Sequence, residues 1–339
     1  MGDERPGLGY IGCAKWARAL AVGVTDSEEV RIVSGFSRRV DPRERFARDF
    51  RCEPCDSIEK MLADERVDGV VICTPNDIHA ENCVAAAEAG KHVFVDKPIT
   101  SRIDDALRVI EACEKNKVLL SVGHNSRRGG RFRKMKELLD AGVAGTLCMA
   151  EGHQSHNGGL RLAADAWRAD STRCPALPLT QLGVHMADTM RFLLGRIEAV
   201  SSMMARRHIP IENVDTTVQT LRFEGGLVGY LGSNYIAPGT NWLRVYGTEA
   251  VVETDHNTNG VMVRFPDGRR EVHPAPQSSP NVEEIEEFGL AIRGKARVEV
   301  GGETGMENLA VVLAALRSHN ERREVAVDEI VEAGKRGEL

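Results

Sequence analysis

Short apolar runs alternate with helical apolar spacing along the first part of the chain. Residues 67–73 (VDGVVIC) form an almost continuous apolar run, which is typical of a strand covered on both faces. Residues 77–89 follow with the character of a helix, and Gly90 ends it. Alternating strands and helices predict a parallel sheet wrapped by helices. The other strands predicted in this region are Arg31–Phe36, 92–95 and 118–122.

One helix in this region has a predicted start. Ser101 and Asp104 have the spacing of a capping box, so we expect Ser101 to cap a helix. Apolar residues then recur at helical spacing, at Ile103, Ala106, Leu107, Ile110 and Cys113.

The pattern changes after Gly123. Helices predicted at 132–141 and 181–194 are followed by several strands in succession, and two late helices near 282–292 and 306–318 close the chain. Strands in series joined by short turns indicate an antiparallel sheet. We therefore predict two domains, over residues 1–123 and 124–339. The strands of the second are expected at 199–205, Thr216–Phe223, 227–234, 242–246 and 250–253.

Length and composition support this division and exclude several classes of protein. The chain has 339 residues, too many for one ordinary core, and its 42% hydrophobic and 28% charged residues are those of a globular protein. The net charge of -6 provides no basic field for nucleic acid. No apolar stretch approaches the ~18 residues of a membrane span, and the first residues lack the apolar core of a signal peptide. We expect a cytoplasmic protein that binds neither nucleic acid nor membrane.

The eight cysteines are expected to be reduced in that compartment. Cys52 and Cys55 form a lone C-x-x-C, and no second His or Cys pair completes a zinc site. His153 and His156 also have the spacing of a metal pair, but no carboxylate partner lies at ligand spacing. We therefore expect no metal. The two histidines either contact substrate hydroxyls or cap loop backbone.

A candidate dinucleotide motif lies close to the N-terminus. The segment GLGYIG, comprising Gly7, Gly9, Tyr10, Ile11 and Gly12, matches G-x-G-x-x-G and precedes a helical pattern. Such a motif should follow a buried strand, yet the residues before it are polar and include a proline. The first strand is therefore predicted to be missing or non-standard.

The residues at the end of the next predicted strand bear on whether the cofactor is NAD or NADP. Ser37 and Arg38 stand where an acidic residue would bind the adenosine ribose of NAD. A carboxylate there would repel a 2′-phosphate, whereas Ser37 and Arg38 are suited to bind one. The sequence favours NADP over NAD. A solvated basic loop is the alternative.

Two later strand ends carry candidate chemistry. Thr74, Pro75 and Asn76 follow the apolar run at 67–73 and are predicted to form a wall of the cofactor site, because ligands bind at the carboxyl ends of such strands. Lys97 follows another strand. A lysine beside a nicotinamide hydrogen-bonds a substrate hydroxyl and favours its alkoxide, although a surface lysine after a strand is the commoner arrangement.

A second constellation lies in the helix predicted at 181–194. Gln181, His185 and Asp188 fall at i, i+4 and i+7, on one stripe of the helix. A histidine accepts a hydroxyl proton near neutral pH, and Asp188 is placed to orient its ring. Taken alone, His185 is better explained by a structural role.

The basic segment 127–136 has six basic residues and one aromatic residue. A site for single-stranded nucleic acid would need interleaved aromatics and a basic domain, so a solvated helix face is the preferred interpretation. Arg127 is alternatively placed to reach an anionic group of a substrate.

Together these residues make the chain similar to the Gfo/Idh/MocA oxidoreductases. The resemblance runs from GLGYIG through TPNDIHAENCVAAAEAGKHVFVDKP and SVGHN to LGVHMAD, and continues through LRVYGTEAVVE and EEFGLAIRG. It implies a Rossmann-type parallel-sheet domain and then an α+β domain with an open, mainly antiparallel sheet that forms a homodimer or homotetramer. It also implies NAD(P)-dependent oxidation or reduction of a sugar, cyclitol or related polyol.

The resemblance also assigns roles to individual residues. Lys97 matches the catalytic lysine and His185 the catalytic histidine, while Gln181 stands where an aspartate is usual. An amide hydrogen-bonds a hydroxyl but takes no proton from it, so proton transfer would rest on Lys97 and His185. The other matched or candidate positions are Thr74, Pro75, Asn76, His79, Asp96 and Pro98 around the cofactor, and His124, Asn125, Arg127, His156, Trp167 and Arg168 around the substrate.

Three functions are compatible with these residues. The first is reversible hydride transfer between NADP(H), or NAD(H), and a secondary alcohol. The second is a reaction in which a retained cofactor is oxidised and reduced in one site, as in sugar–sugar oxidoreduction or oxidation-assisted glycoside cleavage. The third is a cofactor-binding regulator without chemistry, which Gln181 and the missing strand favour and which Lys97 and His185 argue against.

Overall fold

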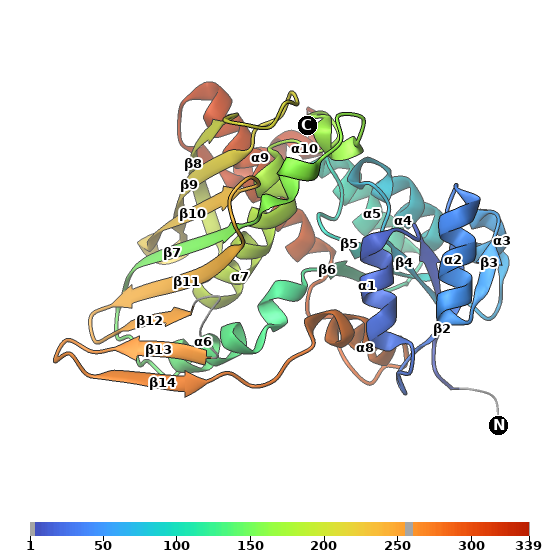
Figure 1. The fold of residues 1–339 in the computed structure, drawn as a ribbon, viewed down its shortest axis with the longest axis horizontal. Coiled ribbons are helices and arrows are strands. Elements are labelled where there is room, and N and C mark those ends of the chain that lie inside the picture. Colours follow the sequence, from blue (N-terminus) through green and yellow to red (C-terminus); the bar gives the residue numbers. More distant parts are fainter. Residues whose placement is uncertain (1–3, 255–259, 339) are drawn as a thin grey trace. The chain divides into compact units, whose positions relative to one another are not determined.

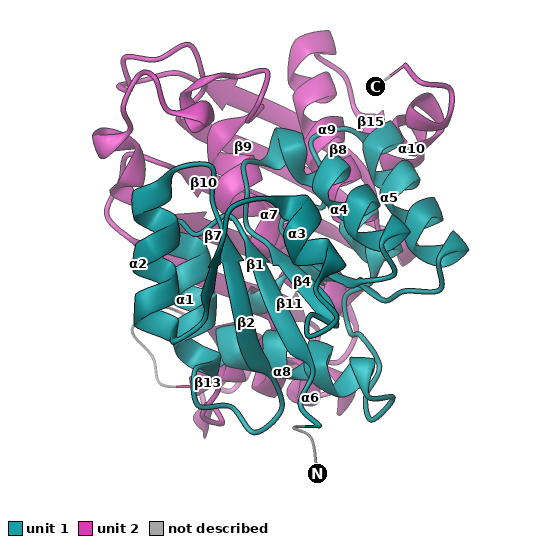
Figure 2. Ribbon diagram, turned by 90° about the vertical axis from the view of Figure 1, so that its right-hand side faces the viewer, with its two compact units in different colours: residues 1–125, 279–306 teal, residues 126–278, 307–339 magenta. Residues whose placement is uncertain are grey.

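The computed structural model describes residues 4–254 and 260–338, and the chain divides into two compact units (Figure 2). Unit 1 comprises the chain up to Asn125 together with Ser279–Met306, and unit 2 comprises Ser126–Ser278 with the remainder from Glu307. The predicted boundary at residue 123 lies close to this division. The prediction that 279–306 belongs with the second domain was wrong, because this segment packs into the core of unit 1.

Unit 1 contains a sheet of six parallel strands in the order β3-β2-β1-β4-β5-β6 (Figure 1). The alternation of strands and helices therefore forms the predicted doubly wound fold. The strands are β1 (Gly7–Ile11), β2 (Arg31–Phe36), β3 (Glu53–Cys55), β4 (Gly69–Ile72), β5 (His92–Asp96) and β6 (Leu120–Gly123). The helices are α1 (Lys15–Val24), α2 (Val40–Phe50), α3 (Ile58–Ala63), α4 (His79–Glu88), α5 (Ile103–Lys115) and α8 (Pro280–Ile292).

The first strand, which was predicted to be missing or non-standard, is present. β1 is the glycine-containing segment Gly7–Ile11 itself, fully buried and paired in parallel with β2 and β4. Neighbouring side chains and backbone require its glycines: a Cβ on Gly7 would lie 2.0 Å from the Arg66 carbonyl oxygen, and one on Gly9 would lie 2.6 Å from Met61 Sδ. Glycine disfavours strands on its own, so tertiary packing decided this element.

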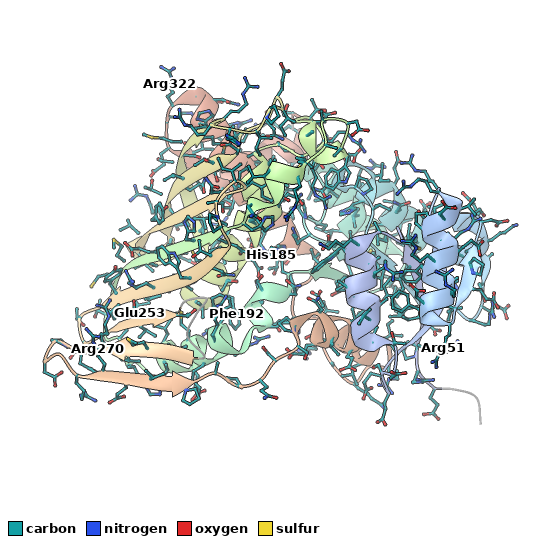
Figure 3. All side chains as sticks on the ribbon, viewed as in Figure 1. Arg51, His185, Phe192, Glu253, Arg270 and Arg322 are labelled. Atoms are coloured by element: carbon teal, nitrogen blue, oxygen red, sulfur yellow. The ribbon has the colours of Figure 1, made fainter. Side chains whose placement is uncertain are left out.

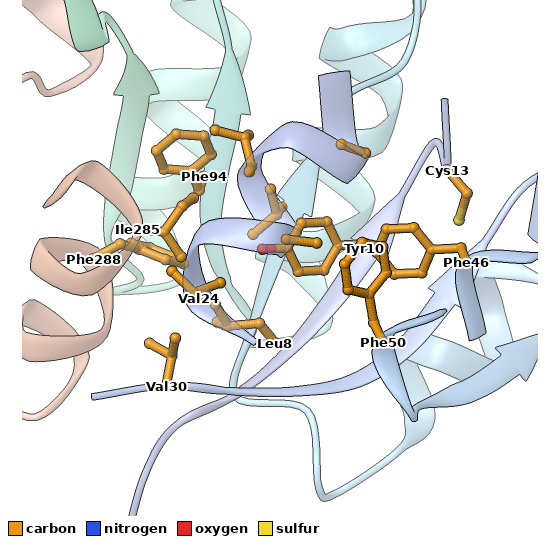
Figure 4. Packing of buried hydrophobic residues seen from close by; sticks show 14 residues of the cluster. Leu8, Tyr10, Cys13, Val24, Val30, Phe46, Phe50, Phe94, Ile285 and Phe288 are labelled. Carbon is orange, nitrogen blue, oxygen red and sulfur yellow. The ribbon is translucent and has the colours of Figure 1, made fainter. Parts of the chain in front are cut away.

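Aromatic side chains fill the core of unit 1 on both sides of β1 (Figure 4). The ring of Tyr10 lies 5.2 Å from that of Phe46, and Phe94 lies 5.9 Å from Phe288 of α8. Phe288 and its neighbour Ile285 are fully buried in this cluster. Their burial explains why α8 belongs to unit 1 despite its late position in the sequence.

The predicted capping box at Ser101 is not formed. α5 begins at Ile103 after Arg102, and no side chain caps it. The Asp104 carboxylate instead accepts hydrogen bonds from Arg102 Nε, at 2.9 Å, and from the backbone N–H of Asp105. A competing local ion pair therefore replaced the reciprocal cap that the spacing suggested.

Unit 2 contains a nine-stranded sheet in the order β14-β13-β12-β11-β7-β10-β9-β8-β15. Only the β10–β7 pairing is parallel among the pairings in the described part of this sheet, so the sheet is mainly antiparallel, as predicted. Sequence analysis missed β7, β13, β14 and β15. The strands are β7 (Leu147–Ser155), β8 (Ile197–Ala205), β9 (Thr216–Phe223), β10 (Val228–Asn234), β11 (Thr240–Gly247), β12 (Val251–Thr254), β13 (Gly260–Arg264), β14 (Arg270–Pro274) and β15 (Val325–Ala326).

Helices cover one face of this sheet. Figure 1 shows α6 (Gly130–Asp140) and α7 (Val184–Leu194) on that face, and the chain ends with α9 (Gly302–Glu321) and α10 (Val327–Lys335). The opposite face carries exposed apolar side chains, including Met149, Met203, Val218 and Val228. None of the helices in residues 4–254 and 260–338 combines the length and apolar character that a membrane crossing requires.

Candidate functional site

A cavity of about 1160 Å³ opens in unit 1 at the carboxyl ends of its central strands. Most of its lining comes from three segments: the β1–α1 loop, the end of β2 with the start of α2, and the turn after β4. Open parallel sheets bind ligands at this edge. The lining residues are Ile11, Gly12, Cys13, Ala14, Lys15, Arg18, Phe36, Ser37, Arg38, Arg39, Val40, Asp41, Pro42, Arg45, Ile58, Cys73, Thr74, Pro75, Ile78 and Asn82.

The loop between β1 and α1 has the geometry of a phosphate-binding turn. Gly12 adopts φ +97, and a Cβ there would lie 2.8 Å from the Cys73 carbonyl oxygen, so this position requires glycine. α1 follows with Ala14 as its N-cap, which makes no side-chain cap hydrogen bond. The first N–H groups of the helix are therefore directed toward the loop without a side-chain cap, an arrangement that binds anions.

This geometry shifts the dinucleotide motif by five residues. Gly7, Gly9 and Tyr10 lie inside β1 and do not line the cavity, whereas Ile11 and Gly12 do. The fingerprint is G-x-A-x-x-A over residues 12–17, with Ala14 and Ala17 in place of the second and third glycines. Assigning Gly7, Gly9 and Tyr10 to a cofactor turn was therefore wrong. The alanine-substituted motif directly after β1 was the signal that sequence analysis overlooked.

Cationic side chains dominate the cavity. Lys15, Arg18, Arg38, Arg39 and Arg45 line it together with a single carboxylate, Asp41. Arg18 is paired with Asp49 at 2.6 Å, outside the set of lining residues. The remaining positive charge suits a ligand that carries several phosphates.

His79 connects the turn after β4 to the loop after β5. Its Nε2 lies 2.9 Å from the Thr74 carbonyl oxygen and its Nδ1 lies 3.0 Å from the Pro98 carbonyl oxygen. Burial lowers the pKa of the His79 ring, and the neighbouring Asp96 carboxylate opposes this effect. The ring thus holds the cavity wall at Thr74 against the loop that carries Lys97, although His79 does not itself line the cavity.

Lys97 follows the last residue of β5, at the same carboxyl edge, and is 8% exposed. Burial raises the pKa of the adjacent Asp96 carboxyl, while the charges of Lys97 and His79 lower it.

The residues that line the cavity do not include the predicted cofactor residues Asn76, Asp96, Lys97 and Pro98. Of the predicted cofactor residues outside the glycine segment, Ser37, Arg38, Thr74 and Pro75 line it.

In unit 2 the second constellation begins in a π-helix. Leu179–Gly183 adopts this rare geometry and continues directly into α7, whose second residue is His185 (Figure 3). Gln181 lies within the π-helix, and both Gln181 and His185 are buried. π-helical segments are unstable on their own and occur frequently at functional sites. This conformation supports a functional role for the pair that the helical spacing alone did not establish.

Gln181 binds the loop that precedes it. Its Oε1 accepts a hydrogen bond of 2.8 Å from Arg168 Nε, and its Nε2 lies 3.4 Å from Cys174 Sγ. The Arg168 guanidinium is 4.4 Å from the centre of the Trp167 ring. The predicted residues Trp167, Arg168 and Gln181 are thus brought together within unit 2.

Asp188 forms a buried ion pair with Arg127. Both of its oxygens accept hydrogen bonds from Arg127, through Nε at 2.7 Å and through Nη2, and Asn308 Nδ2 donates at 2.6 Å. The Asp188 side chain is fully buried and that of Arg127 is 8% exposed. These bonds pair Asp188 with Arg127, and the orientation of His185 by Asp188 stays a prediction. Arg127 is paired within the chain, and its contact with a substrate anion stays a prediction.

The neighbouring basic residues also differ from the prediction. None of the six basic residues in segment 127–136 is fully exposed. Arg133 and Lys136 lie over the ring of Phe192, at 4.9 and 6.0 Å, and Arg127 lies at 5.3 Å (Figure 3). Three of the six basic residues pack around one aromatic ring, which the interpretation as a solvated helix face did not anticipate.

The remaining histidine and asparagine candidates have local partners. His156 Nδ1 accepts the Gly158 backbone N–H at 2.9 Å, which is the loop-capping alternative, and His153 is stacked on Trp242. Asn125 Nδ2 donates to Asn281 Oδ1 at 2.7 Å within unit 1, and its neighbour His124 is 1% exposed.

No group of three or more potential metal-ligating side chains occurs in the described ranges.

Unit 1 is a Rossmann fold with a cationic cavity at the carboxyl edge of its sheet, and unit 2 contains a second, mixed sheet. This combination is typical of dinucleotide-dependent oxidoreductases. A family model described as the oxidoreductase family with NAD-binding Rossmann fold matches residues 7–124, and a model of the GFO/IDH/MocA C-terminal domain matches residues 132–253. The chain belongs to the Gfo/Idh/MocA family, which confirms the resemblance. It is an NAD(P)-dependent enzyme that acts on CH–OH groups.

Several relatives are similar over nearly their whole length. The 1,5-anhydro-D-fructose reductase of Ensifer adhaerens is 26% identical over 91% of this chain and 95% of its own, and the myo-inositol 2-dehydrogenase of Thermotoga maritima is 26% identical over 80% and 83%. A crystal structure provisionally described as an NADPH-dependent oxidoreductase, from Desulfitobacterium hafniense DCB-2, has a TM-score of 0.91 at 35% identity and covers 96% of this chain and 99% of its own.

Proposed function

We propose that this enzyme transfers hydride between NADP(H) and a secondary alcohol, or the matching ketone, of a sugar, cyclitol or related polyol. The cationic cavity at the carboxyl edge of the unit 1 sheet carries this proposal, because it fits a phosphate-rich dinucleotide and lies at the edge where Lys97 is placed. The relatives from Ensifer adhaerens and Thermotoga maritima, which act on an anhydro sugar and on an inositol, support the substrate class.

The protein supplies binding and proton transfer. Gly12 and the start of α1 would hold the pyrophosphate, and Thr74 and Pro75 would form a wall of the site. The bound nicotinamide accepts or supplies the hydride. Lys97 would hydrogen-bond the reacting hydroxyl and favour its alkoxide by charge, and His185 would accept or return the hydroxyl proton. Gln181, being uncharged, would only hydrogen-bond.

A panel of neutral sugars, cyclitols and sugar acids, assayed with NADP⁺, NAD⁺ and their reduced forms, tests this function at 340 nm. We expect turnover that requires added cofactor. Purified protein that retains stoichiometric cofactor and exchanges hydride between two sugars would instead establish the retained-cofactor reaction. Cofactor binding without turnover across the panel would support a regulator.

We expect Arg38→Ala to raise the KM for NADP(H) about 10–100-fold and to leave the KM for NAD(H) nearly unchanged. The cause is the loss of a charge-assisted hydrogen bond to the 2′-phosphate, worth about 1.5–3 kcal/mol. Initial rates with each cofactor measure the effect. Arg51→Ala is the matched control, because Arg51 is exposed and does not line the cavity (Figure 3). Equal losses with both cofactors would contradict NADP preference.

The open face of the unit 2 sheet supports a further proposal, that copies of the chain associate through this face as a homodimer or homotetramer. Its exposed apolar side chains include Met203, which is 79% exposed, and Val228, which is 46% exposed. Such patches mark interaction surfaces. Sedimentation velocity of the full chain tests this, and a monomer at micromolar concentration would contradict it.

A further inference from the structure

We infer that the substrate carries a carboxylate, as in a sugar acid, and that Arg168 binds it. This inference rests on the proposed function and specifies the substrate class of the same site. It starts from the hydrogen bond between Arg168 Nε and the uncharged amide of Gln181, at 2.8 Å.

Arg168 has no acidic partner among residues 4–254 and 260–338. In residues 4–254 and 260–338, its recorded side-chain interactions are the bond to Gln181 and the contact with the Trp167 ring. Asp170, two residues away, instead accepts hydrogen bonds from the backbone N–H and hydroxyl of Thr172. The charge of Arg168 is therefore not neutralised by a carboxylate of the described chain.

Three other shielded arginines of unit 2 are each paired with a carboxylate. Arg127 is paired with Asp188, Arg191 with Glu307 and Arg244 with Glu253. A shielded cation without a counter-charge is costly unless a ligand supplies the charge.

The surroundings of Arg168 partly shield it from water. The Trp167 side chain packs against a buried cluster that includes Leu177, Leu182 and Tyr235. Burial raises the pKa of the Tyr235 hydroxyl, and the positive charge of Arg168 opposes this increase. An ion pair formed in such a partly desolvated position is stronger than one at a fully exposed surface.

The geometry of the guanidinium selects the kind of anion. The bond to Gln181 uses Nε, which leaves the two Nη groups as a fork for an incoming carboxylate. The guanidinium carbon of Arg168 lies 4.4 Å from the centre of the Trp167 ring, so this ring restricts the positions open to the fork. One unpaired cation matches one carboxylate, whereas a dianionic sugar phosphate would leave a second charge without a partner at Arg168.

The uncharged side chain of Gln181 leaves the charge of Arg168 available for a ligand. A carboxylate at this position would accept the Arg168 Nε hydrogen bond and neutralise the cation, whereas the amide keeps the geometry and adds no charge. In the Gln181→Glu variant the new carboxylate would therefore neutralise Arg168 in place of the substrate carboxylate. Glutamate is nearly isosteric with glutamine.

Isothermal titration of the NADP⁺-saturated enzyme with matched ligands tests the inference. The pairs are glucose with glucuronate and galactose with galacturonate, and glucose 6-phosphate is the other anion. We expect at least one uronate to bind about 10-fold or more tightly than its neutral partner. Arg168→Met and Gln181→Glu should each remove this preference, while Arg161→Met, which changes an exposed arginine of the same loop, should preserve it.

The outcomes separate this inference from the proposed function. Uronate binding that depends on Arg168 supports the inference even if no compound is turned over, in which case the proposed hydride transfer fails. Turnover of neutral sugars with no uronate preference overturns the inference and leaves the function intact. A preference that survives in folded Arg168→Met, or tighter binding of glucose 6-phosphate than of either uronate, also overturns it. Circular dichroism establishes folding, and Gln181→Glu provides a second test.

Discussion

Replacing Lys97 with alanine is expected to reduce kcat by about 10²–10⁴-fold while the Kd for NADP(H) changes little, because a positioned proton-transfer group contributes about that much. Lys97 directly follows β5, at the carboxyl edge of the unit 1 sheet, but is not among the residues that line the cofactor cavity. Steady-state turnover and fluorescence titration with NADPH measure the two quantities separately.

Two further variants sharpen this test. Lys97→Arg retains the charge but has no accessible neutral form, so it should bind cofactor and remain at least 10²-fold impaired if proton transfer at this position matters. Lys115→Ala changes an exposed lysine in the last turn of α5 and should behave as the wild type. Normal turnover in folded Lys97→Ala would remove Lys97 from the mechanism.

Replacing Asp188 with leucine is expected to destabilise the protein by about 3–5 kcal/mol, because it leaves the Arg127 guanidinium buried without its counter-charge. The pair is bidentate and almost fully shielded from water, and Asn308 also donates to Asp188. Urea unfolding at pH 7, followed by circular dichroism, measures the change in the free energy of unfolding.

The double variant Arg127→Met/Asp188→Leu identifies the cause. If the uncompensated charge is responsible, the double variant should recover much of the stability lost in either single variant, because an apolar pair of similar volume replaces a buried ion pair at little cost. Losses that simply add would show that the pair does not act as a unit. A loss below 1 kcal/mol in Asp188→Leu would contradict the buried pair itself.

The periodicity of the chain was sufficient for the fold class and for many elements. Arg31–Phe36 and Thr216–Phe223 occur as predicted, and the parallel and antiparallel sheets follow the two regions of the sequence. These elements are predictable because their apolar residues repeat with the period of the local structure.

Other elements depend on contacts that are distant in sequence. β1 is rich in glycine and was interpreted as a turn, but Arg66 and Met61 leave no room for a Cβ at two of its positions. α8 joins unit 1 because Phe288 packs against Phe94, far earlier in the chain. No local sequence pattern predicts these two placements, because each depends on a residue that belongs to another helix, strand or loop.

The candidate site shows the same division. Sequence by itself determined that Lys97 follows a strand, that Ser37 and Arg38 follow another, and that Gln181 stands four residues before His185. Only the tertiary structure decided that Gly12, rather than Gly7 or Gly9, forms the turn, that Asp188 is committed to Arg127, and that the Arg168 charge meets an amide. The physical reason is that residue type and spacing specify which chemistry is available, whereas pairing of charges and exclusion of side chains depend on which atoms the folded chain brings within a few ångströms of each other.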